Sequence, residues 1–302
     1  MTDLFAWFVI DPEHRFLWRA AIMCVLLGVS SSLLGCVLMV RRLSLMGDAL
    51  AHSMLPGVGI AWLMVGTSLP ALLVGGLVAG LFTAIASGLI SRLTRVKEDA
   101  AFAAFFIALL GLGVALVSRA GTPVDLLHFL FGNILAVNAG DLYLAASVSS
   151  LTLLIFALFY RNILLECFDP AYHRACGGWS FTTHLGLLAL VVLNLVAALH
   201  AMGSVLALGL FMLPAVTAYL WCNRWGLMLI VAVLYAVCGS LIGLAISWYA
   251  ALASGPAIVM TLGAGFIISA IISPKQGLLA RFLRPEHHHR EESHEHCDTH
   301  GH

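Results

Sequence analysis

Long apolar runs separated by short polar breaks are the feature that most constrains this chain. A helix of about 20 apolar residues can cross the roughly 30 Å hydrocarbon core of a bilayer. In lipid, backbone polar groups must find partners within the chain, so each run is predicted to be an α-helix. The sequence therefore predicts an all-α polytopic membrane protein with about nine transmembrane helices, eight being the alternative count. The predicted spans are residues 16–40, 47–66, 70–91, 100–118, 140–160, 183–200, 203–222, 226–249 and 255–273.

The composition supports a membrane protein and excludes other classes. Hydrophobic residues make up 61% of the 302 residues and charged residues only 10%, against roughly 25% charged in soluble domains. The net charge is zero and no basic face is visible, so membrane lipid, and no nucleic acid, is the expected surrounding. The first apolar run is too long for a signal-peptide core and should remain as a span.

Basic residues predict the orientation, because Lys and Arg accumulate on the cytoplasmic side of membranes. With nine spans and an outside amino terminus, only Arg15, Arg19 and Arg119 of the 15 Lys and Arg residues lie outside. We therefore expect a periplasmic segment at 1–15, a transmembrane domain at 16–273 and a cytoplasmic His-rich tail at 274–302. The tail from about residue 285 has no apolar residues to bury and is predicted to be disordered.

One acidic residue, Asp48, falls clearly inside an apolar run. A charge at the centre of a membrane helix costs roughly 2.5–3.5 kcal/mol on insertion, so an intramembrane carboxylate is a functional candidate. His52 follows four residues later, and this spacing places both side chains on one helix face. Carboxylate oxygen and imidazole nitrogen suit Zn²⁺ or Mn²⁺. Two ligands are too few, and we hypothesise that a second copy of the chain completes a four-ligand set.

Pro56 predicts a bend in the same helix, since it cannot donate the amide hydrogen that the carbonyl of His52 would accept. Gly57 and Gly59 loosen the next turn. A bent helix beside a carboxylate and an imidazole can line a cation path. The alternative interpretation is that Asp48 caps or pairs at the cytoplasmic interface while His52 is a satisfied polar group.

Further histidines, His128, His184 and His200, lie near predicted ends of spans, where hydrogen-bonded interfacial histidines are the ordinary case. A polar group that faces a bundle interior can also serve transport, and His128 is the best candidate for an additional metal ligand among the three. It belongs to an amphipathic piece at 124–139 that is predicted to form a short interfacial or re-entrant helix.

The carboxyl-terminal tail is rich in side chains that bind metals. Imidazole together with thiolate favours zinc or copper over manganese, and His-rich tracts are typical of metal binding. A purification tag, which the irregular spacing argues against, and a merely solvated tail are the alternatives. The candidate ligands are His287, His288, His289, His294, His296, Cys297, His300 and His302.

Two glycine pairs, Gly76/Gly80 and Gly239/Gly243, have the GxxxG spacing that permits close approach of membrane helices. Neither lysine of the sequence lies in a phosphate-binding loop of the GxxxxGK[ST] type. If ATP drives this protein, another chain must bind it.

The sequence resembles the membrane subunits of bacterial zinc, manganese and iron ABC importers, the ABC-3 permeases. The blocks that carry the resemblance lie in order over residues 16–273. They include LMGDALAHSMLPGVGIA within residues 16–61, VKEDAAFAAFF (96–106), VDLLHFLFGNILAV (124–137), FDPAYHRACG (168–177), GSVLALGLFMLPAVTA (203–218) and SGPAIVM (254–260).

The resemblance implies a homodimer in the bacterial inner membrane, two cytoplasmic ATPase subunits and an extracytoplasmic metal-binding protein. It implies no enzyme activity and no permanently bound cofactor, because the metal ion is the transported substrate. Asp48 and His52 match the metal-coordinating pair of the family.

The family is also similar to the vitamin B12 and siderophore permeases, in which a cytoplasmic helix docks into the ATPase. Carried over, this implies a docking segment from Pro214 to Gly226, with Asn223 and Arg224 at its polar end. The loop at 168–177, with Asp169 and Pro170, is the other candidate docking surface.

We therefore expect a permease subunit that imports a divalent transition metal. The His-rich tail favours zinc, and manganese or iron is the alternative. One rival is a proton-driven secondary transporter in which Asp48 takes up the proton. A membrane metalloenzyme is another, but it needs a third ligand and an activated water, and the sequence has no HExxH motif.

Overall fold

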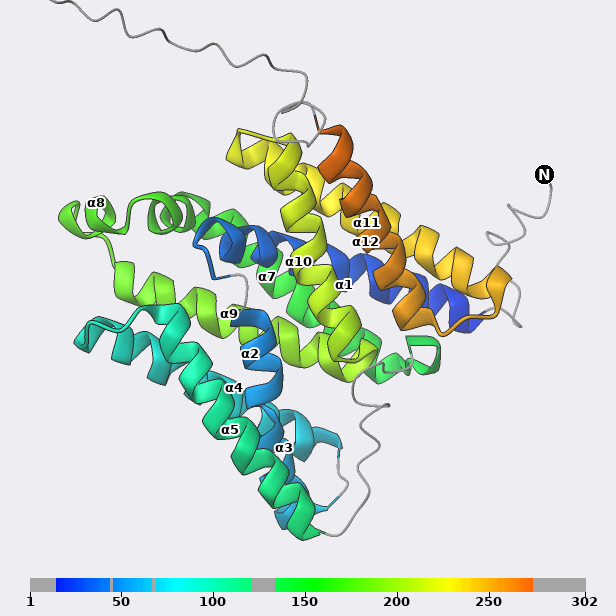
Figure 1. The fold of residues 1–302 in the computed structure, drawn as a ribbon, viewed down its shortest axis with the longest axis horizontal. Helices are drawn as coiled ribbons and strands as arrows, with labels where there is room; N and C mark the ends of the chain where they lie inside the picture. Colours follow the sequence, from blue (N-terminus) through cyan, green and yellow to red (C-terminus); the bar gives the residue numbers. More distant parts are fainter. Residues whose placement is uncertain (1–14, 44–45, 67–68, 121–133, 274–302) are drawn as a thin grey trace, which may run out of the picture.

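The described residues of the computed structural model, 15–43, 46–66, 69–120 and 134–273, are helical apart from short turns (Figure 1). The elements in chain order are α1 (Arg15–Val40), α2 (Met46–Ser53), α3 (Leu55–Val65), α4 (Leu69–Leu93), α5 (Glu98–Ala120), η3 (Ile134–Ala136), α7 (Ala139–Phe168), α8 (Pro170–Ala175), α9 (Ser180–Met202), α10 (Ser204–Trp221), α11 (Trp225–Ala250) and α12 (Ser254–Ile272).

Within these residues, nine helical segments are long and apolar enough to cross a membrane, which confirms the predicted nine-span architecture. Helices α2 and α3 together form the second span, Met46–Val65. Helix α7 runs to Phe168, beyond the predicted end at residue 160, with a kink at Phe159. Polar residues after the kink lower the local hydropathy, and for this reason the sequence predicted an earlier end of the span. The backbone nevertheless stays helical to Phe168.

Helix α1 is central and packs against α7, α10 and α11, while α12 packs on α10 and α11. Helices α2 to α5 lie together on one flank of this group (Figure 1). Helix α9 joins the two groups, because it contacts α7 and α10 on one side and α2 and α4 on the other. Asn194 in α9 donates a 2.7 Å hydrogen bond to Thr152 Oγ1 of α7, which links the two helices through polar groups in the apolar interior.

The bend predicted from Pro56 is a break between α2 and α3 at Met54, and Pro56 occupies the first turn of α3. Pro is suited to the first turn because its missing amide hydrogen would have no helical partner there. Beyond the break, α3 packs closely on α4. A Cβ atom on Gly57 would overlap the carbonyl oxygen of Gly75 and would lie 2.6 Å from Cβ of Ala79.

The predicted glycine pairs differ in what they contact. Gly239 and Gly243 bring α11 against α12, and a Cβ on Gly243 would lie 2.5 Å from Cα of Ile258. Gly80 instead faces side chains, since its Cβ would lie 2.7 Å from Cγ1 of Val192 in α9. The backbone contact of the α3–α4 pair uses Gly57 and Gly75, which have no GxxxG spacing because they lie on different helices.

Three sets of predicted residues lie outside the described part of the chain. They are the amino-terminal segment up to residue 14, most of the amphipathic piece including His128, and the His-rich tail from residue 274.

Candidate functional site

Helix α2 holds Asp48 and His52 on one face, as their spacing predicts. His52 Nε2 lies 3.5 Å from Asp48 Oδ1. The Asp48 side chain is 56% exposed and the His52 side chain 26% exposed. The imidazole also contacts the ring of Phe106 in α5, with 5.7 Å between ring centroids. Phe106 therefore restricts the orientation of the His52 ring.

The opposite face of α2 is anchored in the protein. Met46, Leu50 and Ala51 are completely buried. A Cβ on Gly47 would lie 3.3 Å from Cδ2 of Leu208 in α10, so this residue marks a close approach of the two helices. The apolar face fixes α2, and the rest of the helix presents Asp48 on an open face of the subunit.

The described residues do not form a complete metal site by themselves. Among the described residues, no three His, Cys, Asp or Glu side chains come together in a way that could hold a metal ion. Asp48 and His52 thus supply one oxygen-type and one nitrogen-type ligand, which suits manganese, iron or zinc but needs donors from elsewhere. The third protein ligand that a membrane metalloenzyme would require is not found in the described residues.

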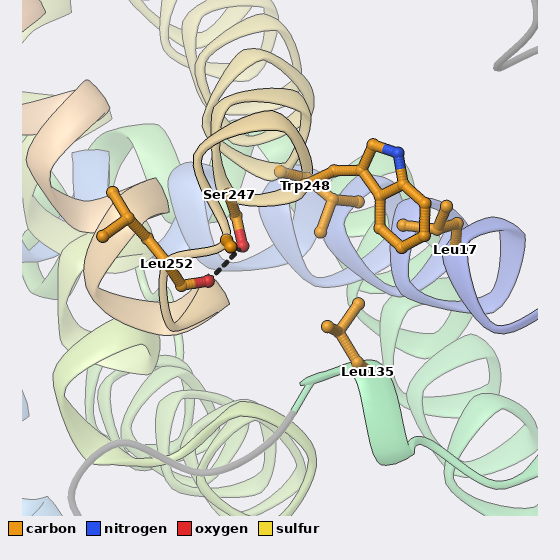
Figure 2. A pocket seen from close by; sticks show the side chains of 7 residues that line it. Leu17, Leu135, Ser247, Trp248 and Leu252 are labelled. Atoms are coloured by element: carbon orange, nitrogen blue, oxygen red, sulfur yellow. Dashed lines mark hydrogen bonds between the residues drawn. The ribbon is translucent and has the colours of Figure 1, made fainter.

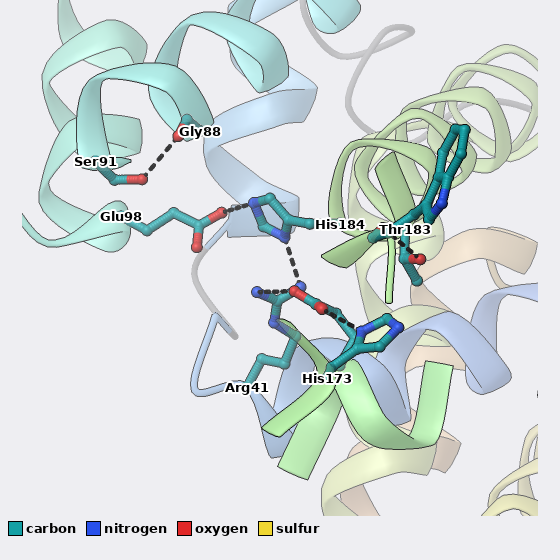
Figure 3. A network of polar contacts seen from close by, with 9 residues as sticks. Arg41, Gly88, Ser91, Glu98, His173, Thr183 and His184 are labelled. Atoms are coloured by element: carbon teal, nitrogen blue, oxygen red, sulfur yellow. Dashed lines mark hydrogen bonds and ion pairs between the residues drawn. The ribbon is translucent and has the colours of Figure 1, made fainter. Parts of the chain in front are cut away.

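A second polar cluster was missed by the prediction from sequence. It is formed by side chains from the end of α1, the start of α5, the last turns of α7, α8 and the start of α9. Arg41 at the end of α1 is its centre. The Arg41 guanidinium contacts His184 Nδ1 at 2.6 Å and lies 3.9 Å from Glu166 Oε1. Figure 3 shows His184 between Arg41 and Glu98, and His184 Nε2 lies 2.9 Å from Glu98 Oε1. We call Arg41, Glu98, Glu166, His173 and His184 the Arg41 network.

The members of the Arg41 network are largely shielded from solvent. The Glu166 side chain is 1% exposed and that of His184 is 2% exposed, and His173 Nδ1 lies 3.0 Å from Glu166 Oε2. Sequence reasoning placed only Asp48 inside an apolar run because the span of α7 was predicted to end before Glu166. Charged residues and histidines recurring at one end of several spans were the signal available.

The remaining predicted histidines also have partners. His184 belongs to the Arg41 network, and His200 Nε2 lies 3.3 Å from Asp141 Oδ1 at the opposite end of α9. Asp141 also accepts the backbone N–H of Asn138 at the start of α7. His200 therefore pairs with a carboxylate near a helix terminus, and contacts within the chain account for both histidines.

A pocket of about 320 Å³ lies away from both polar sites, near the start of α1, the end of α11 and η3 (Figure 2). Its lining is mostly apolar and includes Leu17, Leu135 and Trp248. The hydroxyl of Ser247 donates to the carbonyl of Leu252 at 2.8 Å, so this polar group is already satisfied. The pocket offers no metal ligands.

The predicted docking residues occupy two neighbouring turns. Asp169 is exposed and caps α8, accepting the N–H of Tyr172 at 2.8 Å, and Pro170 begins α8. Asn223 and Arg224 are exposed in the turn between α10 and α11.

An aromatic contact brings these two turns together. Phe168, at the end of α7, packs edge-to-face on Trp225, at the start of α11, with 5.7 Å between ring centroids. Pro214, by contrast, is buried inside α10 and is not part of this surface.

On α8, a hydrogen bond to Cys176 raises the pKa of the exposed Tyr172 above its usual value.

Nine described helical segments are long and apolar enough to cross a membrane, and the second of these spans carries a carboxylate beside an imidazole, so the fold is that of a polytopic membrane protein with a polar pair in one span. The chain belongs to the ABC 3 transport family, whose model matches residues 13–273. This finding confirms the family that the sequence blocks resemble.

Individual relatives cover nearly the whole chain. A manganese transport system membrane protein, MntC, from Halalkalibacterium halodurans is 39% identical over 94% of this chain and 96% of its own length. The chelated iron transport system membrane protein YfeD of Yersinia pestis is 34% identical over 94% of this chain and 95% of its own length.

Solved structures agree with this assignment. The structure of PsaBC from Streptococcus pneumoniae in complex with Fab matches with a TM-score of 0.76 and 33% identity, covering 88% of this chain and 95% of the matched chain. The fold also matches that of a metal-chelate type ABC transporter in an inward-facing conformation, with a TM-score of 0.64. The chain is therefore the multi-pass permease of a bacterial ABC metal importer.

Proposed function

We propose that this chain imports manganese as one of two identical permease subunits, with Asp48 and His52 as the transport ligands. The observation that carries the proposal is the open face on which this pair lies. A carboxylate facing hydrocarbon costs roughly 2.5–3.5 kcal/mol, so the 56% exposed Asp48 needs cover from protein or water. A second copy placed against this face provides that cover and a second carboxylate and imidazole.

The choice of metal rests on the donors and on the relatives. Carboxylate and imidazole donors suit Mn²⁺, and relatives from several bacteria are named as manganese transport proteins. Iron is the second candidate because the Yersinia pestis relative is named for chelated iron. Zinc, which the His-rich tail favoured, has no support in the names of these relatives. It is therefore included as a third metal in the uptake experiment.

The energy for transport comes, in this proposal, from a separate ATPase dimer. The adjoining turns at α8 and at residues 222–224 would receive it, and an extracytoplasmic binding protein would deliver the metal to the other side. These turns lie at the end of the bundle predicted to be cytoplasmic. ATP-driven movement then exposes the ligand pair alternately to the two sides.

The test is ATP-dependent uptake of manganese, iron and zinc into proteoliposomes that contain the chain with its ATPase and binding protein. Asp48→Asn and His52→Gln should each lower manganese uptake by at least about tenfold, because each replaces a carboxylate or imidazole donor with a weaker, neutral amide oxygen. The matched controls are Asp141→Asn and His200→Gln. They alter the Asp–His pair formed between the start of α7 and the end of α9, and they should retain uptake.

Each contrary outcome has a definite meaning. Equal loss in both pairs would refute Asp48 and His52 as the specific transport ligands. Uptake driven by a proton gradient without ATP would refute the ATPase-driven mechanism. Uptake of zinc in strong preference to manganese would refute the choice of metal but leave the ligand pair in place.

A further inference from the structure

The Arg41 network joins the helix that lies in the proposed docking surface to the helix that contacts the metal ligands. We propose that its five residues are positioning residues, which transmit movement of α8 to α5 and thereby set the position of His52. This inference rests on the proposed function, because α8 is taken as part of the surface that receives the ATPase. It assigns a role to Arg41, Glu98, Glu166, His173 and His184.

The first half of the network joins α1 to α5 through α9. An arginine side chain only donates hydrogen bonds, so the 2.6 Å contact from Arg41 requires Nδ1 of His184 to accept. The proton of the neutral imidazole is then on Nε2, the nitrogen that lies 2.9 Å from Oε1 of Glu98. His184 can make both contacts at once only in this tautomer, and the two contacts therefore fix each other.

The second half joins α1 to α8 through α7. Arg41 and His173 approach the two oxygens of the Glu166 carboxylate, at 3.9 Å and 3.0 Å. His173 is the buried residue of α8, whereas the neighbouring Tyr172 is 55% exposed. The backbone after α8 also folds onto His173, since Gly178 N–H donates to its carbonyl at 2.9 Å. Any displacement of α8 must therefore move or break the contact with Glu166.

Helix α5 carries the connection onward to the metal ligands. Glu98 is in its first turn, and Phe106 lies eight residues later, about 12 Å along the axis at 1.5 Å per residue. The ring of Phe106 contacts His52. Ala101 and Phe102, between these two residues, are buried. A shift at the Glu98 end is thus passed along a packed helix to His52.

The chemistry of the network suits a switchable contact better than a source of stability. It contains two carboxylates and one guanidinium at low exposure, and buried ion pairs contribute little net stability relative to apolar packing. A buried ion pair is, however, either formed with good geometry or broken, and intermediate arrangements are unfavourable. Coupling between distant sites requires elements with two discrete arrangements of this kind.

The experiment uses the whole transporter in proteoliposomes and measures manganese taken up per ATP hydrolysed. Glu98→Ala removes the link to α5, while Asp99→Ala removes an exposed carboxylate from the same turn. We expect Glu98→Ala to lower uptake per ATP by about tenfold, within the roughly 5- to 150-fold range of coupling between protein sites. In Glu98→Ala, basal ATP hydrolysis and assembly should match the wild type. Asp99→Ala should match the wild type in uptake per ATP as well. Glu98→Gln keeps an acceptor for His184 and should restore most of the uptake.

A second variant tests the centre of the network. The double substitution Arg41→Gln/Glu166→Gln removes one charge of each sign, so that no unpaired charge is left buried between them. It should reproduce the loss seen in Glu98→Ala, and combining all three substitutions should add little, because the residues act in one chain of contacts. Arg42→Gln, which removes an exposed positive charge from the adjacent position, is the control.

Hydrogen exchange gives a readout that does not depend on transport. Nucleotide added to the wild-type complex should change amide exchange both in α8 and at the start of α5, whereas in the variants only α8 should respond. Unchanged uptake per ATP, or an unchanged exchange response of α5, would overturn the inference. Absence of ATP-driven uptake in the wild type would instead overturn the proposed function, and the exchange experiment would still decide on the network.

Discussion

The guanidinium of Arg41 lies 2.6 Å from Nδ1 of His184, although the two residues are 143 positions apart in the sequence. The contact joins the end of α1, the central helix, to the start of α9, which packs against both groups of helices. Because Arg41 also lies near the buried carboxylate of Glu166, its removal affects more than one pair.

We predict that Arg41→Gln lowers the free energy of unfolding by about 3–5 kcal/mol, since it leaves the buried Glu166 carboxylate without its counter-charge. The double variant Arg41→Gln/Glu166→Gln should recover roughly half of that loss. Unfolding in detergent, followed by circular dichroism, measures both. If the double variant were less stable than the single variant by the full additive amount, the two side chains would not be coupled.

The close packing of α3 on α4 predicts an unusual sensitivity to a single methyl group. Gly57→Ala should destabilise the protein by about 1–3 kcal/mol, because the added Cβ overlaps backbone atoms that cannot move aside alone. Gly111→Ala in α5 is the control, since its Cβ meets no atom within 4 Å. Thermal melting in detergent should separate the two variants, and equal melting temperatures would contradict the packing.

Phe106 should tune the metal affinity without being a ligand. Phe106→Leu removes the ring that contacts His52, and an aromatic contact of this kind is worth about 0.5–1.5 kcal/mol, or roughly a two- to tenfold weaker manganese affinity. The adjacent Phe105 contacts Phe82 instead, with 6.3 Å between ring centroids, so Phe105→Leu should leave the affinity unchanged. Equilibrium binding of manganese to the purified transporter is the measurement, and equal effects would exclude the specific role of Phe106.

The cap of α8 should influence binding of the ATPase. Asp169→Ala removes the acceptor for the Tyr172 N–H, and loss of such a cap costs about 1 kcal/mol of helix stability. We expect a roughly fivefold weaker affinity for the ATPase, measured by titration in detergent. Asp169→Asn retains a side-chain acceptor and should bind nearly as the wild type does. If Asn behaved like Ala, the charge rather than the cap would account for the loss.

The His-rich tail is predicted to bind zinc without taking part in the transport step. A chain that ends at Pro285 should keep its manganese uptake and lose most of its zinc binding, because the tail holds seven of the 13 histidines. Equilibrium dialysis and uptake assays check the two statements separately. A fall in manganese uptake on truncation would show that the tail contributes to transport.

The spans could be predicted from the sequence because hydrocarbon thickness and helix geometry act on each run separately. The break near Pro56 follows from the same local chemistry, and so does the placement of Asp48 and His52 on one face. The end of α7 was missed because a helix can continue through polar residues once its charged groups find partners. Glu166 finds its partner on α8 and near α1.

The Arg41 network could not be predicted for a different reason. Arg41 and Glu98 belong to segments far from His184 in the sequence, and only the packing of α1, α5 and α9 brings them together. The contact of His52 with Phe106 is likewise tertiary. The four-ligand metal site was already a hypothesis from the sequence and stays one, because its completing ligands would belong to a second copy of the chain.

The backbone contact between Gly57 and Gly75 gives the second span two parts of unequal freedom. With no side chains between them, α3 and α4 have little room to slide or roll, and we expect them to behave as one rigid arm. Rotation of the span then concentrates at Met54, the break between α2 and α3. Asp48 and His52, the proposed metal ligands, lie on the α2 side of this break. A movement of α2 together with the helices that anchor it can therefore change the direction in which the pair is presented while α3 stays against α4.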